Sequence, residues 1–167
     1  AAITDAGGKL ESPSIEFGED PDSIFVENLL ASVSQHQRQK NAEQTRNRMR
    51  ARMLNGYWVF QAPTGYKYES VRGQGKVLVR DEPIASALQE GLEAFASGQL
   101  QTRIEFKRFL DRHPGFPKKT GTGKLRRQLA DDLLSRLIYA GYIDAPEWDV
   151  SFRKGQHEPL ISLEAHE

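Results

Sequence analysis

The spacing of apolar side chains divides the chain into a long polar helix and a denser domain. No proline or glycine interrupts residues 22–55, so this stretch predicts a single helix, about 50 Å long at 1.5 Å per residue. In its first half Phe25, Leu29 and Val33 recur every four residues and form an apolar stripe. The next large apolar residue is Met49, so the second half is polar all round. Such a helix bridges two bodies or lies against a charged partner.

Residues 56–167 carry shorter apolar patterns that predict a compact helical domain. The expected elements are a β-hairpin of 66–71 and 76–80, helices at about 82–97 (capped by Asp81), 100–112 and 124–138, and short strands around 148–152 and 160–163. The side chains expected to face inward are Ile84, Leu88, Leu92 and Phe95, then Ile104, Phe106, Phe109 and Leu110, then Leu125, Leu129, Leu133 and Leu137. Residues 1–21 show no periodicity and are expected to be irregular. The predicted fold class is therefore mainly α with small β-hairpins, an α+β arrangement.

The composition limits the possible classes of protein. The 167 residues include no cysteine, which excludes a disulfide framework, a thiolate metal site and a cysteine nucleophile. No apolar run approaches the ~20 residues of a membrane helix, and the first residues lack the pattern of a signal peptide. We expect a cytoplasmic protein without a membrane partner.

The charges cancel overall but are segregated along the chain. There are 23 basic and 23 acidic residues, yet residues 36–55 hold six basic and one acidic residue, and residues 103–127 hold nine and two. Residues 1–35 are the reverse, with one basic and seven acidic residues. Two basic blocks indicate a polyanion-binding surface. The alternative is that each block is simply a solvated face.

Several patterns that suggest catalysis fail on geometry. The segment 119–124 resembles a phosphate-binding loop, but the required Gly and Ser or Thr are replaced by Lys118 and Leu125. Asp131 and Asp132 point about 100° apart on a helix and cannot share one site. The histidines lack metal-ligand spacing and are expected at the surface: His36, His113, His157 and His166. We therefore expect no catalytic residue, no metal and no cofactor in this chain.

The second basic block suggests a variant of the helix-turn-helix. Its last helix is expected to expose Lys124, Arg126, Arg127 and Gln128 in the first turn, where such residues reach base edges in the major groove. The preceding loop offers Lys118, Lys119 and Thr120 to phosphates. The connection of about a dozen residues is too long for the tight form of the motif. Alternatively, this basic surface has no nucleic-acid partner.

From about Ile24 onward the order of segments resembles the large serine recombinases. The segments that carry the resemblance are 25–35 and 50–58, the loop 62–67, the helix 85–95 closing in 96–98, the run 104–110, and 133–137 running into 139–143. The last matches the family's Asn-Pro-x-Tyr-x-Gly signature in its second half only. The family's Tyr-x-Arg-x-Ser pattern around the nucleophile and its cysteine-bearing zinc ribbon do not occur here.

The resemblance implies a fragment of such a recombinase that binds double-stranded DNA at one half-site. It implies a tail of the catalytic domain at 1–21, a connecting helix at 22–55 and a DNA-binding domain at 56–167. The implied DNA contacts include Arg46, Arg48, Arg50 and Arg52 near the crossover point, together with Tyr66 and Lys67 of the loop. The intact bacterial or phage protein would act in DNA integration or excision through a 5′-phosphoserine intermediate, as a homodimer or homotetramer held by the long helix. This chain alone should be inactive.

The apolar stripe of Phe25, Leu29 and Val33 is then a self-association surface. Two other classes remain open. One is a stand-alone dimeric transcriptional regulator with a helix-turn-helix-like domain. The other is a protein-interaction module that uses the stripe and has no affinity for DNA.

Overall fold

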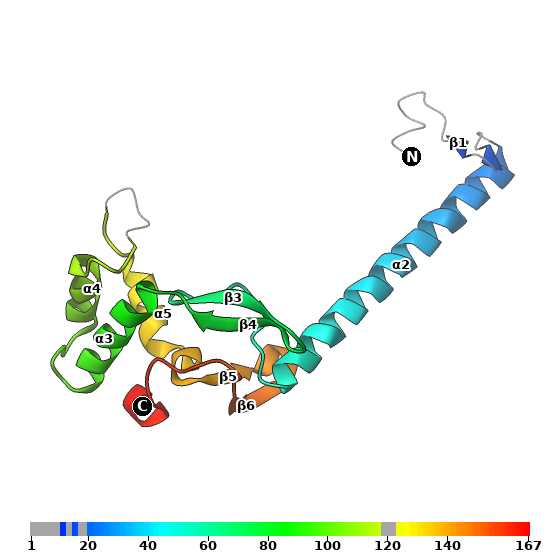
Figure 1. Ribbon diagram of the computed structural model, residues 1–167. Helices are drawn as coiled ribbons and strands as arrows, with labels where there is room; N and C mark the ends of the chain where they lie inside the picture. The colour runs from blue at the N-terminus through cyan, green and yellow to red at the C-terminus, as the bar shows by residue number, and fades with distance from the viewer. Residues whose placement is uncertain (1–10, 13–14, 17–19, 118–122) are drawn as a thin grey trace. The chain divides into compact units, whose positions relative to one another are not determined.

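The computed structural model describes residues 11–12, 15–16, 20–117 and 123–167 (Figure 1). The chain forms two compact units, 1–48 and 49–167, and each is considered by itself. The fold is mainly helical with small antiparallel hairpins, as the sequence predicted. Within the N-terminal segment that was expected to be irregular, β1 (Glu11–Ser12) pairs with β2 (Ile15–Glu16).

The predicted long helix is α2 (Pro21–Leu54). It begins where the Asp20 carboxylate accepts hydrogen bonds from the backbone N–H and hydroxyl of Ser23. It ends in a Schellman motif: Gly56, with φ of +87°, donates to Met53 O, and Tyr57 donates to Arg52 O. The apolar stripe lies in its first half and is exposed, with 67% of Phe25 accessible to solvent.

Both hairpins of the second unit are antiparallel. In the first, β3 (Tyr66–Val71) pairs with β4 (Gly75–Arg80), and β4 begins one residue earlier than expected. In the second, β5 (Tyr142–Ala145) and β6 (Val150–Lys154) are joined by the short helix η2 (Pro146–Trp148). The strand expected around 160–163 is absent; Leu160 and Ile161 are buried and donate to Tyr139 O. A final turn, α6 (Leu163–His166), follows.

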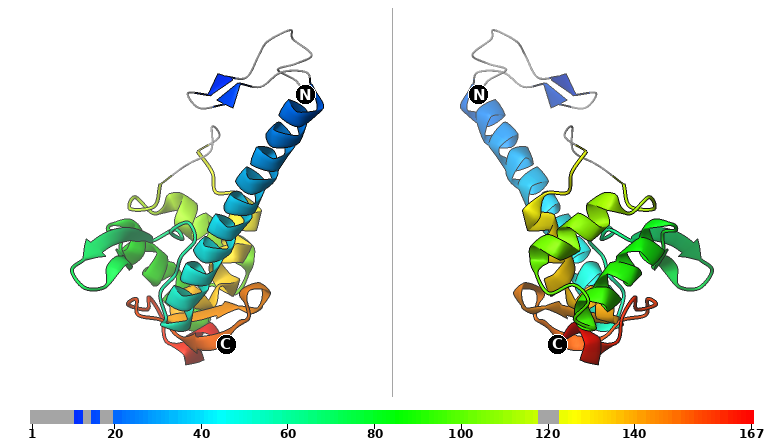
Figure 2. Two further views of the ribbon diagram at one scale, coloured as in Figure 1. Left: turned by 90° about the vertical axis from the view of Figure 1, so that its right-hand side faces the viewer. Right: turned by 90° about the vertical axis from the view of Figure 1, so that its left-hand side faces the viewer.

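Three helices form the rest of the domain: α3 (Ile84–Ala96), α4 (Arg103–Arg112) and α5 (Arg127–Ser135). Figures 1 and 2 show them, and α4 packs against both α3 and α5. The expected cap Asp81 is wrong, because Pro83 occupies the N-cap of α3 and the Glu82 carboxylate accepts the Ser86 N–H. α4 begins later than expected because Thr102 forms a capping box with Glu105.

The helix expected at 124–138 is shorter than predicted. It begins only at Arg127 and ends at Ser135, and the 3₁₀ helix η1 (Leu137–Ala140) follows. The extended backbone at Arg126 separates the loop from the helix. Lys124 and Arg126 therefore precede α5, and Arg127 and Gln128 are its first two residues.

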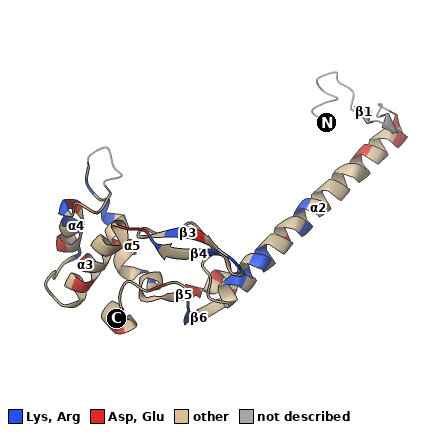
Figure 3. Ribbon diagram, in the orientation of Figure 1, with Lys and Arg blue, Asp and Glu red and all other residues tan. Residues whose placement is uncertain are grey.

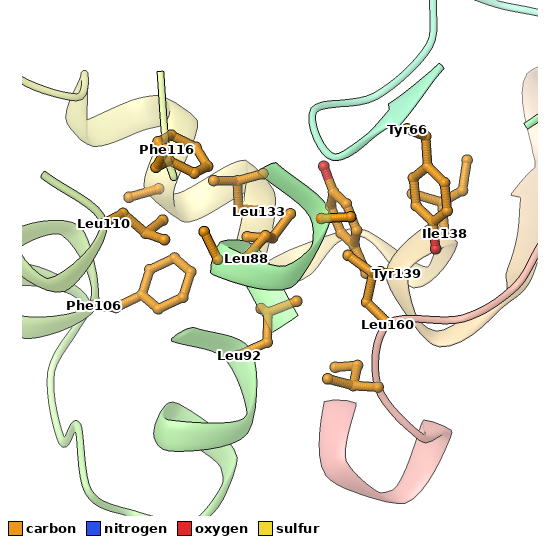
Figure 4. Close-up of a cluster of buried hydrophobic side chains, with 14 of the residues drawn as sticks. Tyr66, Leu88, Leu92, Phe106, Leu110, Phe116, Leu133, Ile138, Tyr139 and Leu160 are labelled. Carbon is orange, nitrogen blue, oxygen red and sulfur yellow. The ribbon is translucent and has the colours of Figure 1, made fainter. Parts of the chain in front are cut away.

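The main core lies between α3, α4, α5 and η1 (Figure 4). Its fully buried members include Leu88, Phe106, Leu110, Leu133 and Tyr139. The helices α3 and α4 approach closely at Gly91, where an added Cβ would lie 3.1 Å from the Phe106 ring. Ile104 was expected to face inward, but it is 51% exposed, because it lies about 200° around α4 from Phe106.

A second core cluster joins the end of α2 to β5 and β6. Met53 is completely buried with Ala145 and Val150, and Phe60 and Trp148 pack against them. The last turn of α2 is therefore part of the compact unit of residues 49–167.

Aromatic side chains hold the loop between α2 and β3. The Tyr68 hydroxyl donates to Phe60 O, and the Trp58 indole donates to Gln61 O. The Tyr139 hydroxyl reaches Thr64 O at 2.9 Å. These bonds satisfy loop carbonyls and explain why this segment is dense in aromatics.

Candidate nucleic-acid interface

The start of α5 presents a cluster of long polar side chains. Its N-cap is Arg126, whose backbone is extended and whose side chain makes no capping hydrogen bond. The N–H groups of a first helical turn have no acceptor within the helix, and they carry the positive end of the helix dipole. The four predicted side chains are exposed here: Lys124, Arg126, Arg127 and Gln128. The structure therefore brings this part of the predicted site together.

Contacts with α4 hold this cluster in place. The Asp111 carboxylate accepts the Leu125 N–H at 2.5 Å through one oxygen and Lys107 Nζ at 2.8 Å through the other. Burial would raise the pKa of Asp111, but the hydrogen bonds from Lys107 and Leu125 outweigh it and hold the pKa below its usual value. The Leu125 side chain is buried, which fixes the loop from the other side.

A second contact lies further along the same two helices. Arg103 Nη1 of α4 lies 3.3 Å from Asp131 Oδ1 of α5. Together with the Asp111 contacts, it attaches both the loop before α5 and the helix itself to α4. These positioning residues were not predicted from the sequence, although Lys107 and Asp111 stand four apart, the spacing at which opposite charges meet on a helix.

The described basic residues of the block 103–127 do not form one face. Arg103 and Lys107 pair with acidic residues on the side of α4 that faces α5. Arg108 and Arg112 lie on another side of the helix, where they line an open pocket with Leu100, Phe109 and Pro114. Figure 3 shows Lys and Arg at both α4 and the start of α5.

The loop residues Tyr66 and Lys67 separate on β3. Lys67 is exposed and remains a candidate for DNA contact. Tyr66 is only 4% exposed, and its hydroxyl donates to Glu158 O. Burial raises the pKa of the Tyr66 hydroxyl. Because successive side chains of a strand point to opposite faces, Tyr66 belongs to the core, and the interpretation of it as a DNA contact is corrected.

The arginines at the end of α2 have different roles. Arg46 and Arg48 are exposed in the second half of the helix. Arg50, in contrast, donates to Trp148 O at 3.0 Å and pairs with the Asp149 carboxylate. Arg52 donates to two carbonyls of the β3–β4 turn, Gln74 O and Lys76 O, and lies over the Tyr57 ring. These two arginines fix the last turn of α2 to both hairpins.

The remaining predictions concern the loop before α5, the histidines, metal sites and membrane helices. Lys118, Lys119 and Thr120 lie outside the described residues. His157 was expected at the surface but is buried, and its Nε2 contacts Ile138 O at 2.6 Å. Among the described residues, no group of three or more histidine or acidic side chains is arranged to hold a metal ion. In the same part of the chain no helix is long and apolar enough to cross a membrane.

Comparisons with known proteins find solved structures that are similar to this chain, and two of them are described below. No family model and no curated protein matches the chain. One structure is a crystal structure of an LSR–DNA complex, with a TM-score of 0.49 and 22% identity over 70% of this chain. The other concerns the sequence requirements of the Listeria innocua prophage attP site, with a TM-score of 0.48 and 22% identity over 71% of this chain. The chain spans 33% and 48% of the lengths of these proteins.

Proposed function

We propose that this chain binds double-stranded DNA and that the start of α5 enters the major groove. The observation that carries the proposal is the exposed set of Lys124, Arg126, Arg127 and Gln128 around a helix start without a side-chain cap. Arg can read guanine and Gln can read adenine through paired hydrogen bonds. Phosphate oxygens would accept from Lys124 and from the N–H groups of the first turn.

The support from α4 matters for this role. Phosphate contacts set the position of a protein on DNA, and base contacts then read the sequence. A helix that reads bases must therefore be held rigidly relative to the rest of its domain. The hydrogen bond from the Leu125 N–H to the Asp111 carboxylate and the ion pair of Arg103 with Asp131 would hold the start of α5 in this way. The exposed Arg46 and Arg48 add positive charge that suits the DNA backbone.

We further propose that the DNA site is a recombination half-site and that the chain acts within a serine site-specific recombinase. The order of segments from residue 24 to residue 143 supports this assignment. One of the similar structures is an LSR–DNA complex, and the role proposed here is of that kind. The recombination chemistry of the family uses a nucleophilic serine that these 167 residues do not supply in the family's pattern. We therefore assign DNA recognition, and no catalytic step, to them.

Binding to duplex DNA tests the proposal directly. Fluorescence anisotropy at several salt concentrations would compare random DNA with fragments that flank the genomic insertion boundaries of the gene. We expect tighter binding to a boundary fragment and a log–log salt slope of roughly one unit per phosphate neutralised. Weak binding without salt dependence or preference would refute DNA recognition.

Variants then locate the reading surface. Replacing Arg127 and Gln128 by Ala should weaken binding to the boundary fragment by about 1–3 kcal/mol per base contact and leave binding to random DNA less affected. The matched control is Arg72→Ala, an exposed arginine in the β3–β4 turn. An equal loss on both DNAs would show that α5 contacts phosphates only.

A further inference from the structure

A pocket of about 490 Å³ lies on α4, away from α5. Leu100, Phe109 and Pro114 supply an apolar surface, and the pocket opens widely to solvent. Phe109 stands two residues from Lys107, so it lies about 200° around the helix from the side chain that faces the start of α5. The pocket is therefore a surface separate from the proposed DNA interface.

Among the residues that line this pocket, two arginines outnumber one carboxylate, that of Glu105. Arg108 and Arg112 line it, are exposed, and stand one turn apart on α4. The acidic neighbours already have partners. Glu105 accepts the N–H groups of Gln101 and Thr102, and Glu90 contacts His113 Nε2 at 2.9 Å.

An apolar floor beside two arginines does not suit every polyanion. A DNA backbone brings phosphates and water against Phe109 and Leu100, so this apolar surface would gain nothing from contact with it. An amphipathic helix offers apolar anchors three or four residues apart, which insert into grooves of this kind. If carboxylates flank the anchors, they can form paired hydrogen bonds with the arginines.

We propose that this pocket binds an acidic amphipathic helix of a partner protein. Leu or Phe side chains of the partner insert between Leu100, Phe109 and Pro114. Two carboxylates, one turn apart in the partner, pair with Arg108 and Arg112. The proposal is independent of DNA recognition, because the residues that carry it lie outside the start of α5.

A pair of synthetic peptides tests the proposal on the full chain. The probe is a labelled helical peptide of roughly 20 residues with Leu at i and i+4 flanked by Glu. The comparison peptide keeps each Leu and replaces each Glu by Lys. We expect saturable binding of the acidic peptide by fluorescence anisotropy and at least about tenfold weaker binding of the basic one. Amide NMR shifts caused by the acidic peptide should be concentrated in residues 100–114.

Charge reversal identifies the surface. The double variant Arg108→Glu, Arg112→Glu should weaken binding of the acidic peptide by about tenfold or more and leave DNA affinity within about twofold of the original protein. The matched control is Arg72→Glu, Lys76→Glu, which changes the net charge equally at the exposed β3–β4 turn and should leave peptide binding unchanged.

Three results would overturn the proposal. The first is equal binding of a third peptide in which Ser replaces each Leu, which would show a plain anion site. The second is equal loss in the control variant. The third is a large loss of DNA affinity in the Arg108 and Arg112 variant with no peptide binding to the original protein, which would assign this face to DNA.

Discussion

At the scale of single residues, buried polar side chains in the unit of residues 49–167 fasten loops to the core. The hydroxyls of Tyr66 and Tyr139 donate to carbonyls far away in the sequence, Glu158 O and Thr64 O. His157 does the same for Ile138 O, but its second ring nitrogen, Nδ1, is buried and has no hydrogen-bond partner among the residues that the structure describes. A neutral imidazole tolerates this better than a charged one, because protonation would place an N–H where no acceptor lies.

Stability should therefore depend on the protonation of His157. Burial lowers the pKa of His157 below its usual value, and the hydrogen bond to Ile138 O only partly opposes this. The unfolded chain binds the proton more readily, so stability is full above the unfolded pKa of about 6.5 and is lost as the pH falls below it. Urea unfolding between about pH 8 and pH 5.5 should show a decrease of at most about 1.4 kcal/mol per pH unit from this one group.

The variant His157→Gln isolates this effect from the other histidines. Glutamine can still donate to Ile138 O but does not titrate. We expect lower stability at pH 8 and a flatter pH dependence than in the original protein. The same slope in both proteins would mean that His157 is not the group responsible.

Single residues also show what sequence reasoning could and could not reach. The composition of β3 predicted the strand, but not which of Tyr66 and Lys67 faces the core, because that depends on the packing partner. His157 has no local pattern that marks it as buried; its burial follows from contact with η1 and Tyr66. Arg50 and Arg52 look equivalent to Arg46 and Arg48 along the sequence, and only the fold of the hairpins separates their roles.

At the scale of elements, the start of α5 has an exposed arginine at a position where a capping residue would make the helix more stable. Ser, Thr, Asp and Asn are the residues that best cap a helix, and Arg126 occupies that place without a capping bond. The variant Arg126→Ser should therefore stabilise the protein by about 1 kcal/mol. It should also weaken binding to the boundary DNA by about tenfold, because it removes a cation from the proposed interface. Thermal unfolding and anisotropy measure the two effects separately.

The matched control is Arg72→Ser, which removes the same charge from the exposed β3–β4 turn. It should change neither the stability nor the DNA affinity appreciably. If Arg126→Ser binds the boundary fragment as well as the original protein, the start of α5 does not face DNA.

The contact between α3 and α4 depends on a helix position without a side chain. A Cβ at Gly91 would lie 3.1 to 3.3 Å from Phe106, Phe109 and Leu110, which is tighter than ordinary contact. We expect Gly91→Val to destabilise the domain by about 2–3 kcal/mol in urea unfolding. Glu93→Val on the exposed side of α3 should cost only about 0.5 kcal/mol, from the difference in helix propensity and the loss of an exposed hydrogen bond from Gln89 Nε2. Equal losses would show that propensity, and not packing, sets the effect.

The order of elements was largely predictable, whereas several boundaries were not. The hairpin of β3 and β4 followed from two β-rich segments around a glycine-bearing turn. Just before α5 begins, the Leu125 N–H donates to the Asp111 carboxylate, a contact across fourteen positions that no local pattern reveals. Leu160 and Ile161 had the apolar character of a strand but fill the core beside Tyr139.

At the scale of the whole molecule, segregated charge predicted the presence of basic surfaces but not their division. The block of residues 103–127 is one run in the sequence, but its basic residues on α4 point to different sides of that helix: Arg103, Lys107, Arg108 and Arg112. Lys107 pairs with Asp111 toward α5, and Arg108 and Arg112 line a different surface. The net charge of the block is therefore larger than the positive charge that its described residues present on any one surface. For this reason, variants of Arg108 should affect peptide binding and variants of Arg127 should affect DNA binding.

The apolar stripe on α2 should make the protein self-associate. Phe25, Leu29 and Val33 are more than half exposed, and side chains of this kind release about 1.5–3 kcal/mol each when they become buried. We expect sedimentation velocity to show a mass that rises with concentration. The double variant Leu29→Gln, Val33→Gln should shift this transition to at least about tenfold higher concentration, since each tenfold corresponds to about 1.4 kcal/mol. Ile104→Gln is the control, because Ile104 is similarly exposed but lies on α4. A monomer at every concentration, or an equal shift in the control, would contradict the assignment of self-association to α2.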